Sequence, residues 1–130
     1  MEAHVTADTN VLVRLLVEDT PKESLRARQL FESTIVFIPA SVFMETEWVL
    51  RAAYEFTPSE IAEAFSRLLR LESVRVEDRR LLESVIEHFA AGLDFADALH
   101  YACGQGRSMK TFDKAFIKRG KARGLNLSAP

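Results

Sequence analysis

Residues 4–10 read HVTADTN, a short strand-like run that ends in an aspartate. The apolar and β-branched residues before Asp8 predict a strand over residues 4–8. Comparable short runs recur along the chain, at residues 34–38, 73–76, 108–112 and 125–127. Helical segments separate these runs, so the sequence predicts an α/β domain with a mainly parallel central sheet. Right-handed crossovers would cover both faces of the sheet with helices, which gives a three-layer α/β/α sandwich.

Capping signals mark the starts of the predicted helices. The runs Thr20-Pro21-Lys22-Glu23 and Thr57-Pro58-Ser59-Glu60 both have the form of a capping box with proline at the first helical position. Ser41 and Asp94 are expected to cap helices, and Gly92 is expected to end a helix over residues 79–91. Further helices are predicted at about residues 11–17 and 114–119. No repeat or linker is visible, so we expect one domain over residues 1–130.

The composition is that of an ordinary soluble protein, with 48% apolar and 28% charged residues. No apolar run is long enough to cross a membrane, and Glu2, Asp8 and Arg14 argue against a secretory signal. The one cysteine, Cys103, excludes an internal disulfide and a cysteine-cluster zinc site. We therefore expect a cytoplasmic protein, with Cys103 in the core.

Charge is distributed unevenly along the chain. Residues 1–106 carry 10 basic and 18 acidic groups, whereas residues 107–130 carry seven basic groups and one acid, Asp113. A basic end on an acidic body could steer a polyanion toward one face of the molecule. A solubilising helix face explains the same pattern equally well.

Four carboxylates far apart in the sequence are the candidates for chemistry: Asp8, Glu45, Asp97 and Asp113. Each is predicted to follow a strand or to lie near the start of a helix, and in an open parallel sheet such positions face one crevice. Two carboxylates about 5 Å apart repel by ~3 kcal/mol at an effective dielectric of ~20. The cluster therefore calls for a divalent cation. Hard oxygen ligands select Mg²⁺ or Mn²⁺ over zinc, and such ions suggest phosphate chemistry.

Each acid also has a structural interpretation. Asp8, Asp94 and Asp113 could simply be helix caps that accept backbone N–H bonds. Asp97 would occupy the third helical position, where negative charge is favoured by the helix dipole. Glu45 differs, because the spacing places it on an apolar stripe with Val42, Trp48, Val49 and Ala52. Its neighbour Glu47 is expected to form a surface ion pair with Arg51.

These motifs resemble a known family when they are taken together. The quoted segments are DTN at residues 8–10, FMETEWVL at 43–50, DFADAL at 94–99 and TFD at 111–113. In this order and at this length they resemble the PIN-domain ribonucleases, and among them the VapC-type toxins of bacterial toxin–antitoxin pairs. The resemblance implies a Rossmann-like sheet and a Mg²⁺- or Mn²⁺-dependent endoribonuclease. It also implies a homodimer that a cognate VapB-like antitoxin inhibits.

The resemblance also assigns roles to residues. Asp8, Glu45 and Asp97 match the three central acids of the family, and Asp113 matches a more variable fourth. Many relatives carry that fourth acid about three residues later, where this chain has Phe116, so Asp113 must serve. Thr9, Asn10 and Thr111 match polar positions that often support the acids.

The resulting hypothesis is metal-assisted hydrolysis of single-stranded or looped RNA. The candidate phosphate contacts are Arg14, Arg51, Lys110 and Lys114. Two alternatives stay open: a phosphoaspartate phosphatase or receiver-like domain built on Asp8, and a non-catalytic α/β binding module in which the acids are caps. Large apolar groups on the helices at residues 41–54 and 57–70 agree with a homodimer interface or with a well-filled core.

Overall fold

The computed structural model describes residues 4–130, which form two compact units, residues 4–79 and 80–130. All strand pairings are parallel, and helices separate the strands along the chain. The predicted α/β class with a parallel sheet is therefore confirmed. The expectation of a single domain over residues 1–130 stays a prediction, because each unit has its own sheet.

The first unit is built on a sheet in the order β1-β2-β3, from the strands Val5–Thr6, Val36–Phe37 and Val74–Arg75. The register pairs Val5 with Val36, and Val36 with Val74. The strands are shorter than predicted, with two residues in each. Backbone bonds nonetheless continue the pairing, as from the Ala7 N–H to the Phe37 carbonyl at 3.0 Å.

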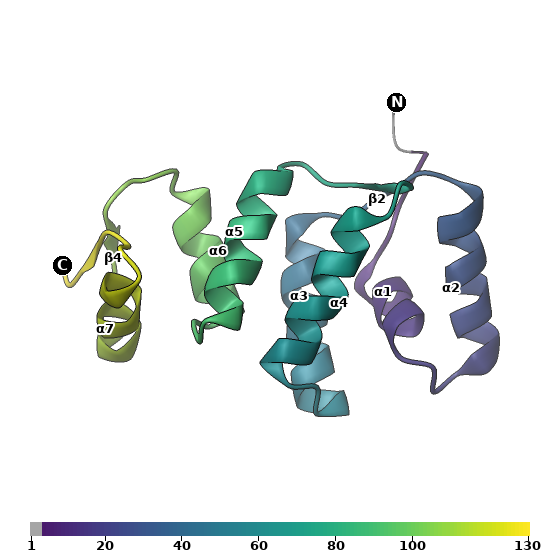
Figure 1. Cartoon of the computed structure of the whole chain (residues 1–130), viewed down its shortest axis with the longest axis horizontal. Helices are drawn as coiled ribbons and strands as arrows, with labels where there is room; N and C mark the ends of the chain where they lie inside the picture. Colours follow the sequence, from purple (N-terminus) through teal and green to yellow (C-terminus); the bar gives the residue numbers. More distant parts are fainter. Residues whose placement is uncertain (1–3) are drawn as a thin grey trace. The chain divides into compact units, whose positions relative to one another are not determined.

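Two helix pairs connect these strands. α1 (Thr9–Leu16) and α2 (Pro21–Ser33) lie between β1 and β2, while α3 (Ala40–Tyr54) and α4 (Pro58–Arg70) lie between β2 and β3. α1 packs against α2 and α3, and α3 packs against α4, as Figure 1 shows. Phe43 and Phe65 are fully buried in the core of this unit. Their rings meet edge to face, with centroids 5.2 Å apart. Such a pair adds about 1 kcal/mol beyond its buried area.

The second unit holds the rest of α5 (Arg79–Ala90), α6 (Phe95–Cys103) and α7 (Lys114–Ala122), with β4 (Met109–Lys110) paired to β5 (Leu127–Ser128). Gly92 ends the α5 segment at a φ of 114°, a conformation that favours glycine, as predicted. Phe89 and Phe95 meet edge to face in the core of this unit. Gly120 is buried in α7, where a side chain would collide with Leu127, so glycine lets α7 approach β5 closely.

Some of the predicted caps are confirmed and others are wrong. Thr57 and Glu60 form a complete capping box, and Asp94 caps α6. Thr20 makes no side-chain cap bond: its hydroxyl donates to Asp19, and the Glu23 carboxylate pairs with Arg14. Ser41 is not the cap of α3 either: this helix begins one residue earlier, after Pro39.

The first helix begins at Thr9 with Asp8 as its cap, two residues before the predicted start. Cys103 was expected in the core and is instead exposed. It is the last residue of α6, and the buried face of that helix is formed by Phe95, Ala98 and Leu99.

Candidate functional site

Asp8 and Glu45 come from different elements of the first unit and meet through Thr9. Asp8 lies just after β1 and caps α1, with its Oδ1 atom accepting the Thr9 N–H at 2.7 Å. The Thr9 hydroxyl donates a hydrogen bond to Oε1 of Glu45 on α3. Thr9 is buried while both carboxylates are exposed, so the threonine holds two acids at the surface. We call Asp8, Thr9 and Glu45 the Thr9 cluster.

The predicted apolar stripe on α3 is wrong. Glu45 is exposed and Trp48 is 59% exposed, whereas Glu47 is 3% exposed. The helix turns its Phe43, Thr46 and Leu50 side inward, which carries Glu47 into the core and Glu45 to the surface. The Arg51 Nε donates to Glu47 at 2.7 Å, so the expected ion pair exists but its acid is buried.

Asp97 and Asp113 come together in the second unit. Both line a cavity of about 100 Å³ whose wall also includes Asp94, Phe116 and Arg119. Asp94 caps α6 by accepting the Asp97 N–H at 3.1 Å, and Asp113 caps α7 by accepting the Phe116 N–H at 3.0 Å. Capping and a site role are therefore compatible for these acids. We call this space the acid cavity.

Burial, and then the charges of Asp94 and Asp113, raise the pKa of Asp97, and the nearby His100 partly offsets that rise. The charged form of Asp97 is thus disfavoured in the folded chain. A cation bound beside it would relieve the same repulsion, and carboxylate oxygens are the ligands that Mg²⁺ and Mn²⁺ prefer. The chemistry of the donors therefore fits a divalent ion.

Within residues 4–130, neither the Thr9 cluster nor the acid cavity has enough ligating side chains to form a metal site by itself. Over the described residues, neither residues 4–79 nor residues 80–130 bring three or more His, Cys, Asp or Glu side chains close enough to hold an ion. The Thr9 cluster supplies two acids to the predicted set, and the acid cavity supplies the other two.

The predicted supporting residues lie beside their acids. Thr9 joins Asp8 to Glu45, and the Thr111 hydroxyl accepts the Asp113 N–H at 3.1 Å. Asn10 is exposed on the first turn of α1.

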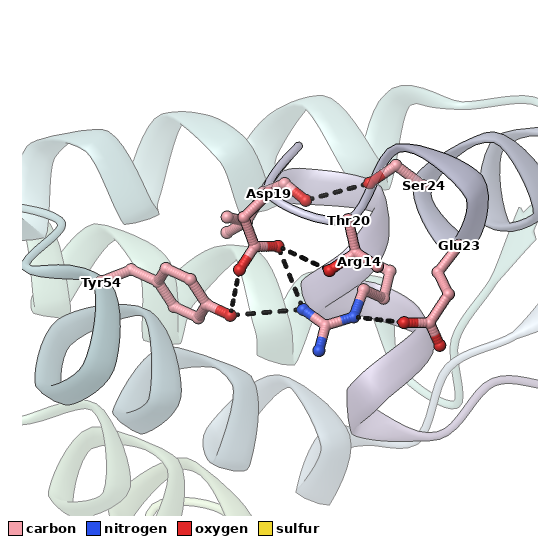
Figure 2. Close-up of polar contacts among 7 residues, drawn as sticks. Arg14, Asp19, Thr20, Glu23, Ser24 and Tyr54 are labelled. Carbon is pink, nitrogen blue, oxygen red and sulfur yellow. Dashed lines mark hydrogen bonds and ion pairs between the residues drawn. The ribbon is translucent and has the colours of Figure 1, made fainter.

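Three of the four predicted phosphate contacts already have partners within the chain. Arg14 contacts Asp19, Glu23 and Tyr54 (Figure 2). Arg51 pairs with Glu47, and the Lys110 Nζ donates to the Ser128 hydroxyl at 2.7 Å. Lys114 is exposed at the first position of α7, next to Asp113.

Arg119 was not among the predicted site residues, yet it lines the acid cavity with Asp97 and Asp113. It makes no ion pair within 4.0 Å among the described residues. The excess of basic residues after position 106 pointed to a cation in this region, but it did not distinguish Arg119 from its basic neighbours.

The sequence model of the PIN domain family matches residues 5–122, which span both units and all four acids. The chain belongs to the PIN domain family, whose members are generally nucleases that use divalent metals. No curated protein matches the chain. None of the helices within residues 4–130 is both long and apolar enough to cross a membrane.

Proposed function

We propose that this PIN domain is a Mg²⁺- or Mn²⁺-dependent endoribonuclease whose metal ligands are Asp8, Glu45, Asp97 and Asp113. One observation carries the proposal: in a chain that matches the family over residues 5–122, the four acids form two surface groupings beside helix N-termini. The raised pKa of Asp97 adds support: burial raises it most, and the neighbouring Asp94 and Asp113 raise it further, and a bound cation would offset both effects.

The reaction is hydrolysis of a phosphodiester bond. The oxygen of water forms a new bond to phosphorus, the bond from phosphorus to the leaving sugar oxygen breaks, and that oxygen takes up a proton. When bound, the metal supplies positive charge that stabilises the phosphate oxygens and lowers the pKa of water. Thr9 fixes the orientation of Glu45, and the backbone N–H of Thr9 fixes that of Asp8.

A basic group near the acids can hold the phosphate. Arg119 lines the acid cavity, and Lys114 is exposed next to Asp113. We propose these two residues as phosphate contacts, ahead of Arg14 and Arg51, whose guanidinium groups already bind carboxylates. Single-stranded or looped RNA is the proposed substrate, because a flexible strand can bend its backbone toward the acids.

The test is cleavage of single-stranded RNA by purified protein. We expect cleavage with Mg²⁺ or Mn²⁺, no cleavage with EDTA, and no cleavage by Asp8→Asn or Asp97→Asn. The matched control is Glu63→Gln, which removes an exposed carboxylate of α4 that pairs only with Arg67 and should leave the activity unchanged. Full activity in either aspartate variant would remove the proposal.

The finer proposal is that the protein is the cytoplasmic toxin of a VapBC-type pair, inhibited by a VapB-like antitoxin. Its support is the resemblance of the motifs and the length to VapC-type toxins. Induced expression in bacteria should then arrest growth, expression of Asp8→Asn should not, and co-expression of the adjacent small gene should relieve the arrest. Normal growth on expression of active enzyme would separate the nuclease from the toxin role.

The proposed homodimer is supported by Trp48, the single tryptophan of the chain, which is 59% exposed on α3. A large exposed aromatic side chain is a common interface anchor. Sedimentation velocity should give a dimer for the wild type and a shift toward monomer for Trp48→Ala. A monomeric wild type would contradict this part.

The two alternatives make different predictions. A phosphoaspartate enzyme would become labelled on Asp8 by a small phosphodonor. A non-catalytic binding module would show no rise in melting temperature with Mg²⁺.

A further inference from the structure

The first unit has a cavity that shares helix α1 with the Thr9 cluster. It has a volume of about 420 Å³ and is formed between α1 and α2. Asn10, Val11 and Arg14 line it from α1, and Arg26 and Leu30 are among the residues that line it from α2. We call it the α1–α2 cavity. Asn10 follows Thr9 in the first turn of α1, so the cavity and the Thr9 cluster use the same helical turn.

The lining suits part of a nucleotide. Val11, Ala27 and Leu30 provide apolar groups. The polar and charged groups of the lining are Asn10, Arg14, Glu23 and Arg26. The volume falls within the range of small-ligand pockets. A base or ribose could contact the apolar groups while its phosphate stays near a cation.

The charge of Arg14 is already neutralised within the chain, so its proposed contribution to the cavity is the flat face of its guanidinium group. Figure 2 shows its guanidinium held by three partners: Asp19 at 3.2 Å, the Tyr54 hydroxyl at 3.2 Å and Glu23 at 3.4 Å. The Tyr54 hydroxyl also donates to Asp19 at 2.9 Å. The two carboxylates balance the charge of Arg14 and keep its planar group in one place. A fixed guanidinium plane is a good stacking surface for a base.

Arg26 is the second cation of the α1–α2 cavity, whose one lining carboxylate, Glu23, pairs with Arg14. It is exposed, and no residue of the described part of the chain pairs with it. Arg28, two positions further along α2, behaves differently: it pairs with Glu18 at 2.9 Å and lines another cavity, with Leu15 and Phe31. The same helix thus presents one arginine that is available to an anion and one that is already neutralised.

We infer that the α1–α2 cavity binds one nucleotide of an RNA strand next to the bond that is cleaved. Arg26 contacts a phosphate of that nucleotide, and the base lies against the apolar groups and the fixed Arg14 plane. The inference rests on the proposed ribonuclease function, and it adds a subsite outside the acids that perform the reaction.

The test is binding of a fluorescently labelled single-stranded RNA in EDTA, followed by anisotropy, for the wild type, Arg26→Ala and Arg28→Ala. We expect about fivefold to tenfold weaker binding for Arg26→Ala and no change for Arg28→Ala. Removing one phosphate contact should also lower the slope of log Kd against log salt by about 0.7 for single-stranded nucleic acid. A merely structural role for Arg26 would leave that slope unchanged.

Cleavage with Mn²⁺ provides the second measurement. Since the subsite binds a nucleotide that does not react, Arg26→Ala should raise KM and leave kcat nearly unchanged. Equal binding, salt slope and KM in Arg26→Ala and the wild type would overturn the inference while leaving the nuclease intact. An altered sedimentation coefficient of Arg26→Ala would also overturn it, because the cavity would then be an interface between protein chains. A wild type that neither binds nor cleaves RNA would overturn the proposed function itself.

Discussion

Glu47 is a buried carboxylate whose charge is balanced by a half-exposed arginine. Its side chain is 4% exposed and lies 2.7 Å from Arg51, whose side chain is 44% exposed. Removing one partner of such a pair leaves an uncompensated charge in the core, which costs far more than the loss of a surface pair. The stability of α3, which also carries Glu45, therefore depends on this contact.

Arg51→Ala should lower the free energy of unfolding by about 1–2 kcal/mol, below the cost of a fully buried pair because Arg51 is partly solvated. The matched control is Arg67→Ala, which breaks the pair between Glu63 and Arg67, with the same spacing and both groups exposed, and should cost less than about 0.5 kcal/mol. Urea denaturation measures both. Equal costs would show that Glu47 is not buried.

His88 gives the second unit a dependence on pH. Burial, and then the charge of Arg123, lower the pKa of His88, while Glu87 acts in the opposite direction. The His88 Nδ1 accepts a hydrogen bond from the Arg123 Nε at 2.9 Å, which requires that nitrogen to be unprotonated.

Since the unfolded chain binds a proton at this histidine more readily, the free energy of unfolding should fall as the pH drops from about 7.5 to about 5.5. In His88→Gln, which keeps an acceptor for Arg123, part of that fall should disappear. The exposed His100 serves as the control position, through His100→Gln. The midpoints of urea unfolding, measured across this pH range, test this prediction. Identical pH profiles for His88→Gln and the wild type would show that His88 is not the source of the pH dependence.

At the scale of elements, helix starts are where the sequence was most informative. Proline at the first helical position and a cap before it located α2 and α4 correctly, because these signals act within one turn. The side-chain bonds at Thr20 and the inward face of α3 were not predictable in the same way. Glu23 is drawn to Arg14 on another helix, and the side of α3 that turns inward is decided by packing against its neighbours.

The two similar start motifs should therefore contribute unequally to stability. Thr57→Ala removes a bond at 3.1 Å to the Glu60 N–H and should cost about 1 kcal/mol. Thr20→Ala removes no capping bond and should cost only a few tenths of a kcal/mol. Thermal or urea unfolding of both variants provides the comparison. A larger loss for Thr20→Ala than for Thr57→Ala would contradict the observed caps.

At the scale of the whole molecule, the order of short acidic motifs identified the family correctly. The four acids could be proposed from local patterns, because Asp8, Asp97 and Asp113 cap helices or lie in their first turn, and Glu45 lies just over one turn into α3. Their partners could not: Thr9 reaches Glu45 across 36 positions, and Arg119 lines the acid cavity through the packing of α7. Contacts at such separations depend on tertiary structure and leave no local signature in one sequence.

The central proposal is that Asp8, Glu45, Asp97 and Asp113 are ligands of a divalent cation. Calorimetric titration of metal-free protein with Mn²⁺ tests this most directly, using the wild type, Asp8→Asn, Asp97→Asn and the control Glu63→Gln. The account predicts that the wild type and the control bind Mn²⁺, and that Asp8→Asn and Asp97→Asn each weaken that binding. Unchanged Mn²⁺ binding in both Asp8→Asn and Asp97→Asn would contradict it.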